Sequence, residues 1–136
     1  MYRVTNPIVL RAVNHYLDEH LEQHEKVGEI FKRKKFPTSQ VRNLQHIVFT
    51  ATRFTAITNF VKNQIGKDSD KKYWASRENG AMVGEIVLEA LDTLRKQAEK
   101  IAVEFNDSPH NVALHLTRGW VEQVVTHYLF LKARGE

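Results

Sequence analysis

The fold is decided first by residues 7–34, PIVLRAVNHYLDEHLEQHEKVGEIFKRK. Apolar side chains recur here three or four residues apart, or at multiples of these steps, and acidic residues occupy many positions between them. This spacing is typical of one face of an amphipathic helix, with Asn6 as its cap and Pro7 in its first turn. The stretch therefore predicts a long first helix that ends near Lys34. Its apolar stripe consists of Leu10, Val13, Leu17, Leu21, Val27 and Phe31.

The rest of the chain shows the same helical period three more times. Thr38 or Ser39 is the expected cap of the next helix, and Gly66 is expected to close it. No stretch predicts a β-strand. We therefore expect an all-α fold, a single antiparallel bundle of about four long helices, with residues 1–136 as one helical domain. The further helices are predicted at 39–65, at 81–105, and from 109 to near the carboxyl end.

The composition is that of an ordinary globular chain. Of its 136 residues, 42% are hydrophobic and 26% are charged, and there is no cysteine, which excludes disulfides and thiolate chemistry. No apolar run approaches the roughly 20 residues that span a bilayer, and the amino terminus does not resemble a signal peptide. The sequence predicts a cytoplasmic protein without a membrane partner.

Residue patterns for catalysis or metal binding are not found. His20 and His24 have a spacing that can bind a metal on a helix, but neither Glu-x-x-His nor His-Glu-x-x-His occurs. We interpret these histidines as lying at the edges of a helix interface. Arg42 is too close to His46 for the Arg–His arrangement of helical RNA-cleaving domains, and no glycine-rich phosphate loop is present. The prediction is a protein that is not an enzyme and has no cofactor or metal.

Positive charge is concentrated in one part of the chain. The net charge is +4, but residues 30–67 contain eight basic residues and no Asp or Glu, which leaves the remainder with a net charge of −4. Such asymmetry indicates an anionic partner more directly than the overall charge does. The eight are Lys32, Arg33, Lys34, Lys35, Arg42, Arg53, Lys62 and Lys67.

The same segment has the side chains that a nucleic-acid-binding surface needs. Lys and Arg bind phosphates where no carboxylate competes, and amides and hydroxyls add contacts to phosphate, sugar or base edges. Phe49 could stack on an unpaired base, although a place at the core edge is the more common role of such a residue. The predicted contact residues for single-stranded RNA or DNA are Lys32, Arg33, Lys34, Lys35, Arg42, Asn43, His46, Phe49, Arg53 and Lys62.

A second interpretation needs no nucleic acid. The basic side chains could pair with the acidic side of the 7–34 helix, either within the bundle or across an interface between copies of the chain. The protein would then be a homo-oligomeric helical module for protein interaction. The acidic residues considered for this pairing are Glu19, Glu22, Glu25 and Glu29.

Residues 36–44, FPTSQVRNL, resemble the small helical subunit of type III CRISPR effector complexes, in which a Thr-Ser-Gln-(Ile/Val)-Arg-like start often opens a central helix. The resemblance extends to residues 64–67. It implies a non-catalytic subunit of an antiviral ribonucleoprotein, present in several copies beside other subunits along the guide and target strands. Carried over to this chain, it implies that Arg42 and Arg53 contact the strand backbone without reading sequence.

Overall fold

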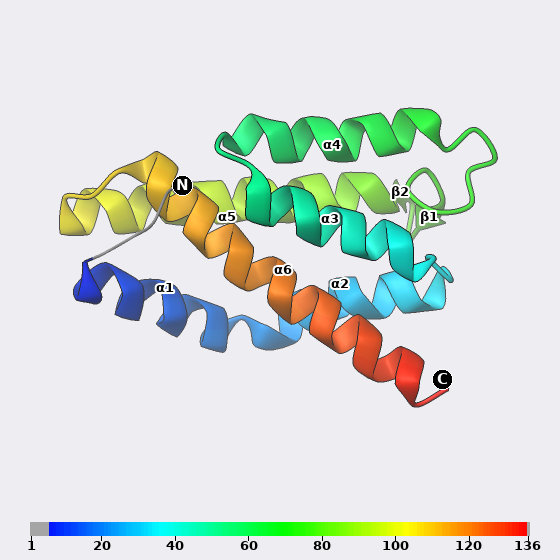
Figure 1. Ribbon diagram of the computed structural model, residues 1–136, viewed down its shortest axis with the longest axis horizontal. Coiled ribbons are helices and arrows are strands. Elements are labelled where there is room, and N and C mark those ends of the chain that lie inside the picture. Colours follow the sequence, from blue (N-terminus) through cyan, green and yellow to red (C-terminus); the bar gives the residue numbers. More distant parts are fainter. Residues whose placement is uncertain (1–5, 136) are drawn as a thin grey trace.

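The computed structural model describes residues 6–135, which form six α-helices and one short hairpin (Figure 1). The all-α expectation is confirmed, but two of the four predicted helices are each divided in two. The ends of the predicted domain, residues 1–5 and 136, lie outside the described part. The elements are α1 (Pro7–Glu19), α2 (Leu21–Arg33), α3 (Thr38–Thr50), α4 (Phe54–Lys67), β1 (Arg77–Glu78), β2 (Ala81–Met82), α5 (Val83–Phe105) and α6 (Pro109–Ala133).

The first predicted helix is interrupted at His20, which separates α1 from α2. Asn6 caps α1 as predicted, because its side-chain oxygen accepts the N–H of Ile8 at 2.9 Å. Leu17 and Val27 are buried on either side of the interruption. Leu21 directly after it is 39% exposed, so the predicted stripe is wrong at this position.

The predicted helix over 39–65 is wrong as one element, because the chain turns at residues 51–53 and α4 runs back beside α3 (Figure 1). The buried residues explain the turn. Val48 and Ile57 are both fully buried, yet residues nine apart point to opposite sides of a continuous helix with about 3.6 residues per turn. A turn between them lets both helices bury their apolar sides.

The predicted ends of this segment also differ from the structure. Pro37 occupies the cap position of α3 without a side-chain hydrogen bond, so neither Thr38 nor Ser39 is the cap. At the other end α4 continues through Gly66. The predicted start of the last helix at 109 is confirmed, and Ser108 caps α6 there, because its hydroxyl accepts the N–H of Asn111 at 3.2 Å.

Helices α5 and α6 lie between the α1–α2 pair and the α3–α4 pair (Figure 1). The α6 helix crosses the bundle and contacts α1, α2, α3 and α5. Trp120 on α6 is completely buried, and Trp74 in the α4–β1 connection is 1% exposed, so both tryptophans pack inside the bundle. None of the described helices is both long and apolar enough to cross a membrane.

A buried aromatic cluster holds the corner between α2 and α3. The rings of Phe31 and Phe36 are 4.7 Å apart, and Trp74 packs edge-on against both. The N–H of Phe36 donates to the Phe31 carbonyl and that of Lys35 to the Lys32 carbonyl, each at 3.0 Å. These bonds and the Phe–Phe contact define a Schellman motif. The basic residues 32–35 are therefore held in a defined corner between two buried rings.

The connection between α4 and α5 contains a feature that the sequence reading missed. Arg77 pairs with Met82 and Glu78 with Ala81 in a hairpin around residues 79–80. Both turn residues have positive φ, 52° for Asn79 and 87° for Gly80, as an Asn-Gly hairpin turn requires. The expectation of no strand is therefore wrong here.

Candidate nucleic-acid interface

The exposed side of α3 brings together four of the predicted contact residues. Arg42, Asn43, His46 and Phe49 are all exposed at helical three- and four-residue spacing. The helix rises about 1.5 Å per residue, so this side extends for about 10 Å between Arg42 and Phe49. The Phe49 ring is 41% exposed, which leaves part of its surface accessible for stacking. Arg53 is exposed in the α3–α4 turn that follows, at the cap position of α4.

Two residues of the basic run hold the hairpin. Arg33 forms an ion pair with Glu78, and Lys34 donates to the Arg77 carbonyl at 2.5 Å. The Lys34 amine also lies 3.9 Å from the Glu78 carboxylate. These contacts reduce the positive charge that Arg33 and Lys34 offer to an outside ligand.

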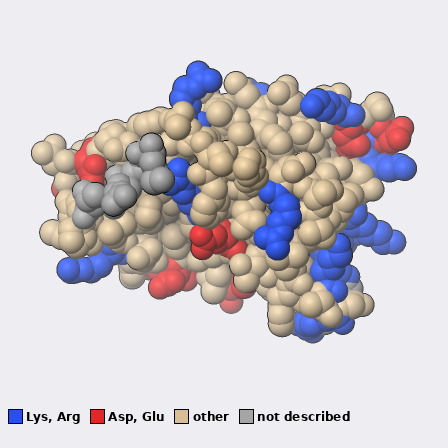
Figure 2. All heavy atoms as spheres, viewed as in Figure 1, with Lys and Arg blue, Asp and Glu red and all other residues tan. Residues whose placement is uncertain are grey.

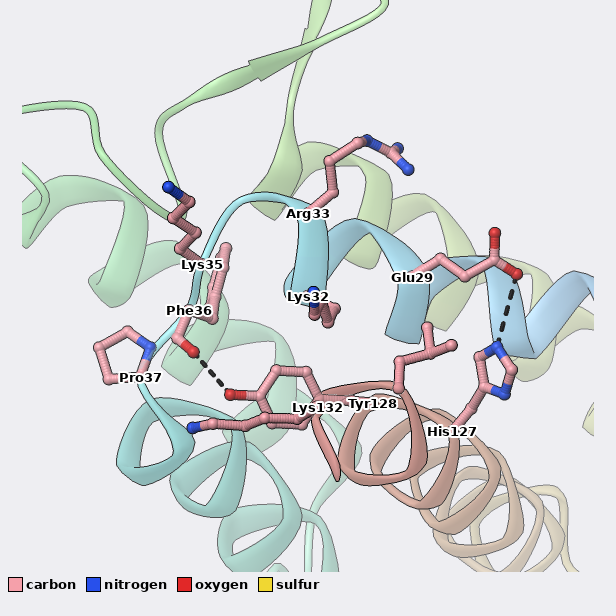
Figure 3. A pocket seen from close by; sticks show the side chains of 10 residues that line it. Glu29, Lys32, Arg33, Lys35, Phe36, Pro37, His127, Tyr128 and Lys132 are labelled. Atoms are coloured by element: carbon pink, nitrogen blue, oxygen red, sulfur yellow. Dashed lines mark hydrogen bonds and ion pairs between the residues drawn. The ribbon is translucent and has the colours of Figure 1, made fainter. Parts of the chain in front are cut away.

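The other two residues of the run, Lys32 and Lys35, line a recess where α2 and α6 end. Its volume is about 660 Å³, and α6 contributes Lys132 to the same recess (Figure 3). The Lys132 amine donates to the Thr38 hydroxyl, and the Tyr128 hydroxyl donates to the Phe36 carbonyl at 2.6 Å. In the view of Figure 2, Lys and Arg side chains gather at this end of the molecule.

Lys62 stands apart from the other predicted contact residues. It is exposed on α4, nine residues after Arg53, which corresponds to about 13 Å along a helix. Helix α4 packs against α3 and α5, so Lys62 belongs to a neighbouring helix and not to the exposed row on α3.

Several acidic residues of α1 and α2 contact histidines and not the basic row on α3. Glu25 and Glu29 lie 3.4 and 3.5 Å from the ring nitrogens of His127 on α6, and Glu19 lies 3.2 Å from His15. Among residues 6–135, no ion pair joins these glutamates to the arginines of the α3 row. The predicted pairing within one bundle is therefore not formed in the described part of the chain.

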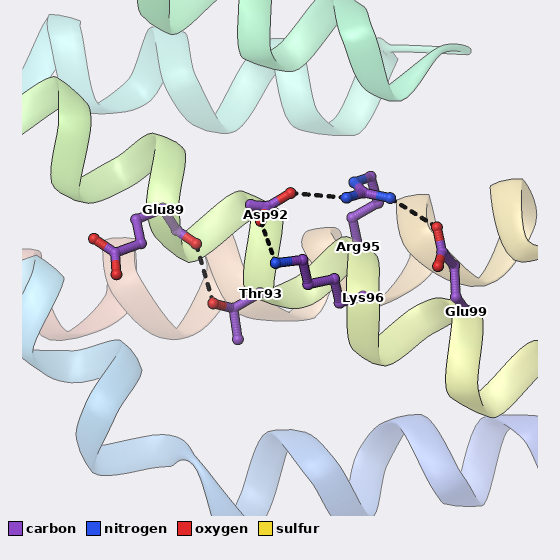
Figure 4. A network of polar contacts seen from close by, with 6 residues as sticks. All are labelled: Glu89, Asp92, Thr93, Arg95, Lys96 and Glu99. Atoms are coloured by element: carbon purple, nitrogen blue, oxygen red, sulfur yellow. Dashed lines mark hydrogen bonds and ion pairs between the residues drawn. The ribbon is translucent and has the colours of Figure 1, made fainter.

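The exposed charges of α5 compensate one another, unlike those of α3. Asp92 accepts from Arg95 at 2.9 Å and lies 3.0 Å from the Lys96 amine, and Arg95 also bonds to Glu99 at 2.7 Å (Figure 4). The hydrogen bonds from Arg95 and Lys96 lower the pKa of Asp92. No such compensation is available along residues 38–67, because they contain no Asp or Glu. An outside anion therefore meets less competition on α3 than on α5.

The two histidines considered for metal binding, His20 and His24, have structural partners. The His24 Nδ1–H donates to the Gln123 side-chain oxygen at 2.6 Å, and Gln123 donates in turn to the Leu17 carbonyl at 3.1 Å. The His20 ring stacks on Tyr16 with the ring centres 3.9 Å apart. Within residues 6–135, no three His, Asp or Glu side chains converge as a metal site would need.

A second groove, called the acidic groove below, lies between α1, α2 and α6, and its carboxylates stand within an otherwise largely uncharged lining. Its volume is about 780 Å³, and Asp18, Glu25 and Glu122 line it. Two exposed apolar residues, Leu21 and Phe130, also line it, with exposures of 39% and 53%. In Figure 2, several acidic side chains lie along the lower edge of the molecule, over α1 and α2.

Sequence reasoning missed the part of the basic surface that α6 contributes. Lys132 lies more than ninety residues after Thr38, and only the packing of α6 against α2 and α3 brings them together. The sole local signal is the favourable place of a cation in the last turn of a helix, which indicates a capping role and not a binding site.

Comparisons with family models, with curated proteins and with solved structures found no match to this chain.

Proposed function

We propose that this chain is a non-catalytic subunit of a ribonucleoprotein assembly that contacts the backbone of a single-stranded nucleic acid. The contact surface is the exposed row on α3, from Arg42 to Phe49, with Arg53 in the turn that follows and the basic recess at the ends of α2 and α6. The observation that carries the proposal is the row itself. Cations, an amide, an imidazole and a half-exposed aromatic ring lie side by side on a segment without a carboxylate.

This set of groups suits a backbone more than a base sequence. Cations at intervals along a helix neutralise successive phosphates, and an exposed ring stacks on any base because every base has a flat face. The resemblance of residues 36–44 to the small subunit of type III CRISPR effector complexes supports the same function. The segment that carries the resemblance includes Arg42 and leads directly into the row.

A second candidate function is supported by the acidic groove. The groove complements the α3 row in two ways. Its carboxylates are opposite in charge to the arginines of the row, and its exposed apolar residues could cover the exposed ring of Phe49. The carboxylates belong to Asp18, Glu25 and Glu122, and the apolar residues are Leu21 and Phe130. A second copy of the chain could place its basic row on this groove, which would make the protein a homo-oligomeric interaction module without nucleic acid. Its discriminating property is association with itself.

Binding of labelled single-stranded RNA, followed by fluorescence anisotropy at two salt concentrations, tests the main proposal. We expect binding that weakens as the salt concentration rises, and that weakens at least about tenfold when Arg42→Glu and Arg53→Glu are combined. Each lost phosphate contact should also reduce the slope of log K against log[salt] by about 0.7 on single strands. The control is Lys96→Glu with Lys100→Glu on α5, which makes the same change in net charge and should leave most of the binding.

Two outcomes separate the candidates. RNA binding that the α3 double reversal leaves unchanged would contradict the proposed surface. If no RNA binds, and sedimentation shows micromolar self-association that Glu122→Lys abolishes, the protein is the interaction module instead.

A further inference from the structure

A smaller cavity lies between α2 and α5 and reaches inward to α6. Its volume is about 230 Å³. The exposed residues Lys26 on α2 and Glu89 on α5 line it near the surface, whereas His24, Leu94 and Trp120 line it from the buried side. Figure 4 shows the part of α5 that carries Glu89, with the ribbons of α1 and α2 beside it. The cavity therefore opens at the surface and ends in the core.

The buried end of the cavity contains a hydrogen-bond donor without a partner. Trp120 is completely buried, and its indole Nε1–H makes no hydrogen bond within residues 6–135. The other tryptophan, Trp74, donates its indole N–H to the Gln40 side-chain oxygen at 2.9 Å. A buried donor that lacks an acceptor destabilises a fold. Because the Trp120 indole forms part of the cavity wall, an acceptor bound in the cavity can supply the missing bond.

His24 adds a hydrogen-bond acceptor to the same cavity. The Gln123 side-chain nitrogen donates to the Leu17 carbonyl at 3.1 Å, so the amide oxygen is left to accept the His24 Nδ1–H at 2.6 Å. Burial lowers the pKa of His24, so the ring is neutral at about pH 7 and its Nε2 keeps a lone pair. In the part of the chain that the structure describes, no group donates to this nitrogen.

The rest of the lining favours a flat, uncharged ligand. A cavity of about 150 Å³ already accepts benzene, so the volume here suits one ring with substituents and is too small for a drug-sized molecule. Tyr16, His24 and Trp120 provide aromatic rings, which pack favourably against other planar rings. Lys26 and Glu89 have opposite charges, and a buried ion without a counter-charge of its own is costly.

We infer that this cavity binds a free, uncharged heterocycle of the nucleobase type, which accepts the Trp120 N–H on a ring carbonyl and donates a ring N–H to His24. Uracil has both groups side by side on one edge of a single ring. The site is separate from the row on α3, because α5 and α6 lie between the α1–α2 pair and the α3–α4 pair (Figure 1). The inference therefore does not rest on the proposed strand-binding function.

Uracil is the probe for the experiment, titrated into isotopically labelled protein while NMR records the two indole N–H resonances. We expect a saturable downfield shift of the Trp120 proton, because a hydrogen bond deshields it. The Trp74 proton already bonds to Gln40 and should not move. Benzene has a ring without polar groups and should bind at least about tenfold more weakly, as the loss of a well-formed hydrogen bond implies.

Ala90→Leu tests the location of the site without removing either polar group. Ala90 lines the cavity from α5, and leucine is a good helix former whose larger side chain fills part of the volume. This variant should abolish the uracil-induced shift of the Trp120 proton. Ala133→Leu, exposed at the end of α6, is the matched control and should preserve the shift.

Trp120→Phe tests the donor itself, because it keeps an aromatic ring in the core but removes the N–H. Uracil binding, measured by calorimetry, should weaken about tenfold, whereas benzene binding should not weaken. If this variant does not fold, the comparison of Ala90→Leu with Ala133→Leu still decides.

A Trp120 proton that does not move at millimolar uracil, or benzene that binds as tightly as uracil, would overturn the inference. A uridine oligonucleotide that shifts Trp120 as strongly as free uracil would also contradict it, because the cavity would then take a base from a strand. Arg42→Glu combined with Arg53→Glu should weaken RNA binding and leave the uracil titration unchanged. The two proposals can therefore fail separately.

Discussion

At the scale of single residues, one carboxylate organises the connection between α4 and the hairpin. Both oxygens of Asp68 accept backbone N–H groups, from Lys72 at 3.1 Å, Tyr73 at 2.8 Å and Ala75 at 2.9 Å. Burial by itself would raise the pKa of Asp68, but these three hydrogen bonds outweigh it and lower the pKa. The loop therefore depends on the ionised form of this side chain.

Asp68→Asn should destabilise the protein by about 1–2 kcal/mol, because an amide cannot accept on both sides and loses the charge that strengthens the bonds. The lowered pKa means that this stabilisation is present above about pH 3.9 and is lost as the pH falls below that value. Urea unfolding of variant and wild type at neutral and acid pH measures both effects. Asp70→Asn, exposed in the same loop, is the control and should change stability by less than about 0.5 kcal/mol. Equal effects of the two substitutions would contradict the role of Asp68.

At the scale of elements, the sequence predicts where helices exist better than where they turn. Proline and side-chain caps mark the starts of α1 and α6, and both starts are confirmed. The α3–α4 turn has neither glycine nor proline, so nothing local announces it. Its only signal is that Val48 and Ile57 would point to opposite sides of one continuous helix. A list of apolar residues along that helix does not reveal this change of side. Tertiary packing decides the turn.

Helix α2 packs so closely on α6 that one position must be glycine. A Cβ on Gly28 would lie 2.6 Å from the Val124 carbonyl oxygen and 3.1 Å from the Tyr128 backbone nitrogen. Both neighbours are backbone atoms of α6, which cannot move aside as a flexible side chain can. At Gly119 on α6 an added Cβ would lie 2.3 Å from the Leu17 side chain, which is free to shift, unlike the backbone atoms next to Gly28.

Gly28→Ala should therefore destabilise the bundle by about 1–3 kcal/mol, the usual range for overpacking a well-filled contact. Gly66→Ala is the matched control, because it also lies in a helix but has no atom within 4 Å of the added Cβ. It should stabilise the protein by up to about 1 kcal/mol through helix propensity. Denaturant unfolding of both variants measures the difference in sign. A neutral Gly28→Ala would show that α2 and α6 lie further apart than the structure places them.

At the scale of the whole molecule, the crossing of α6 explains why the candidate site was only partly predictable. The segregation of charge into residues 30–67 is a property of the sequence, and the exposed row on α3 follows from it. The recess is different, because Lys132 reaches Thr38 only after α6 has packed against α2 and α3. A pattern within one segment cannot predict a site that is formed by distant segments.

The same packing encloses two histidines. His24 on α2 is 6% exposed, and burial lowers its pKa, although its hydrogen bond to Gln123 acts in the opposite direction. Burial also lowers the pKa of His115 on α6, and nearby Arg118 adds to the effect. In the folded protein both rings therefore stay neutral at a pH where an unfolded chain would already bind protons.

This difference makes the stability of the whole bundle depend on pH in a defined direction. A histidine whose pKa is lower in the folded state contributes stability above its unfolded pKa of about 6.5, and that stability is lost as the pH falls. The urea midpoint should therefore be lower near pH 5.5 than near pH 7.5. Combining His24→Gln with His115→Gln should flatten this dependence, even if the loss of the His24–Gln123 bond lowers stability at both values. His15→Gln changes a side chain that is 74% exposed and should leave the slope as it is. A slope that survives the double substitution would assign the pH dependence to other groups, because neither substituted position can then bind a proton in either state.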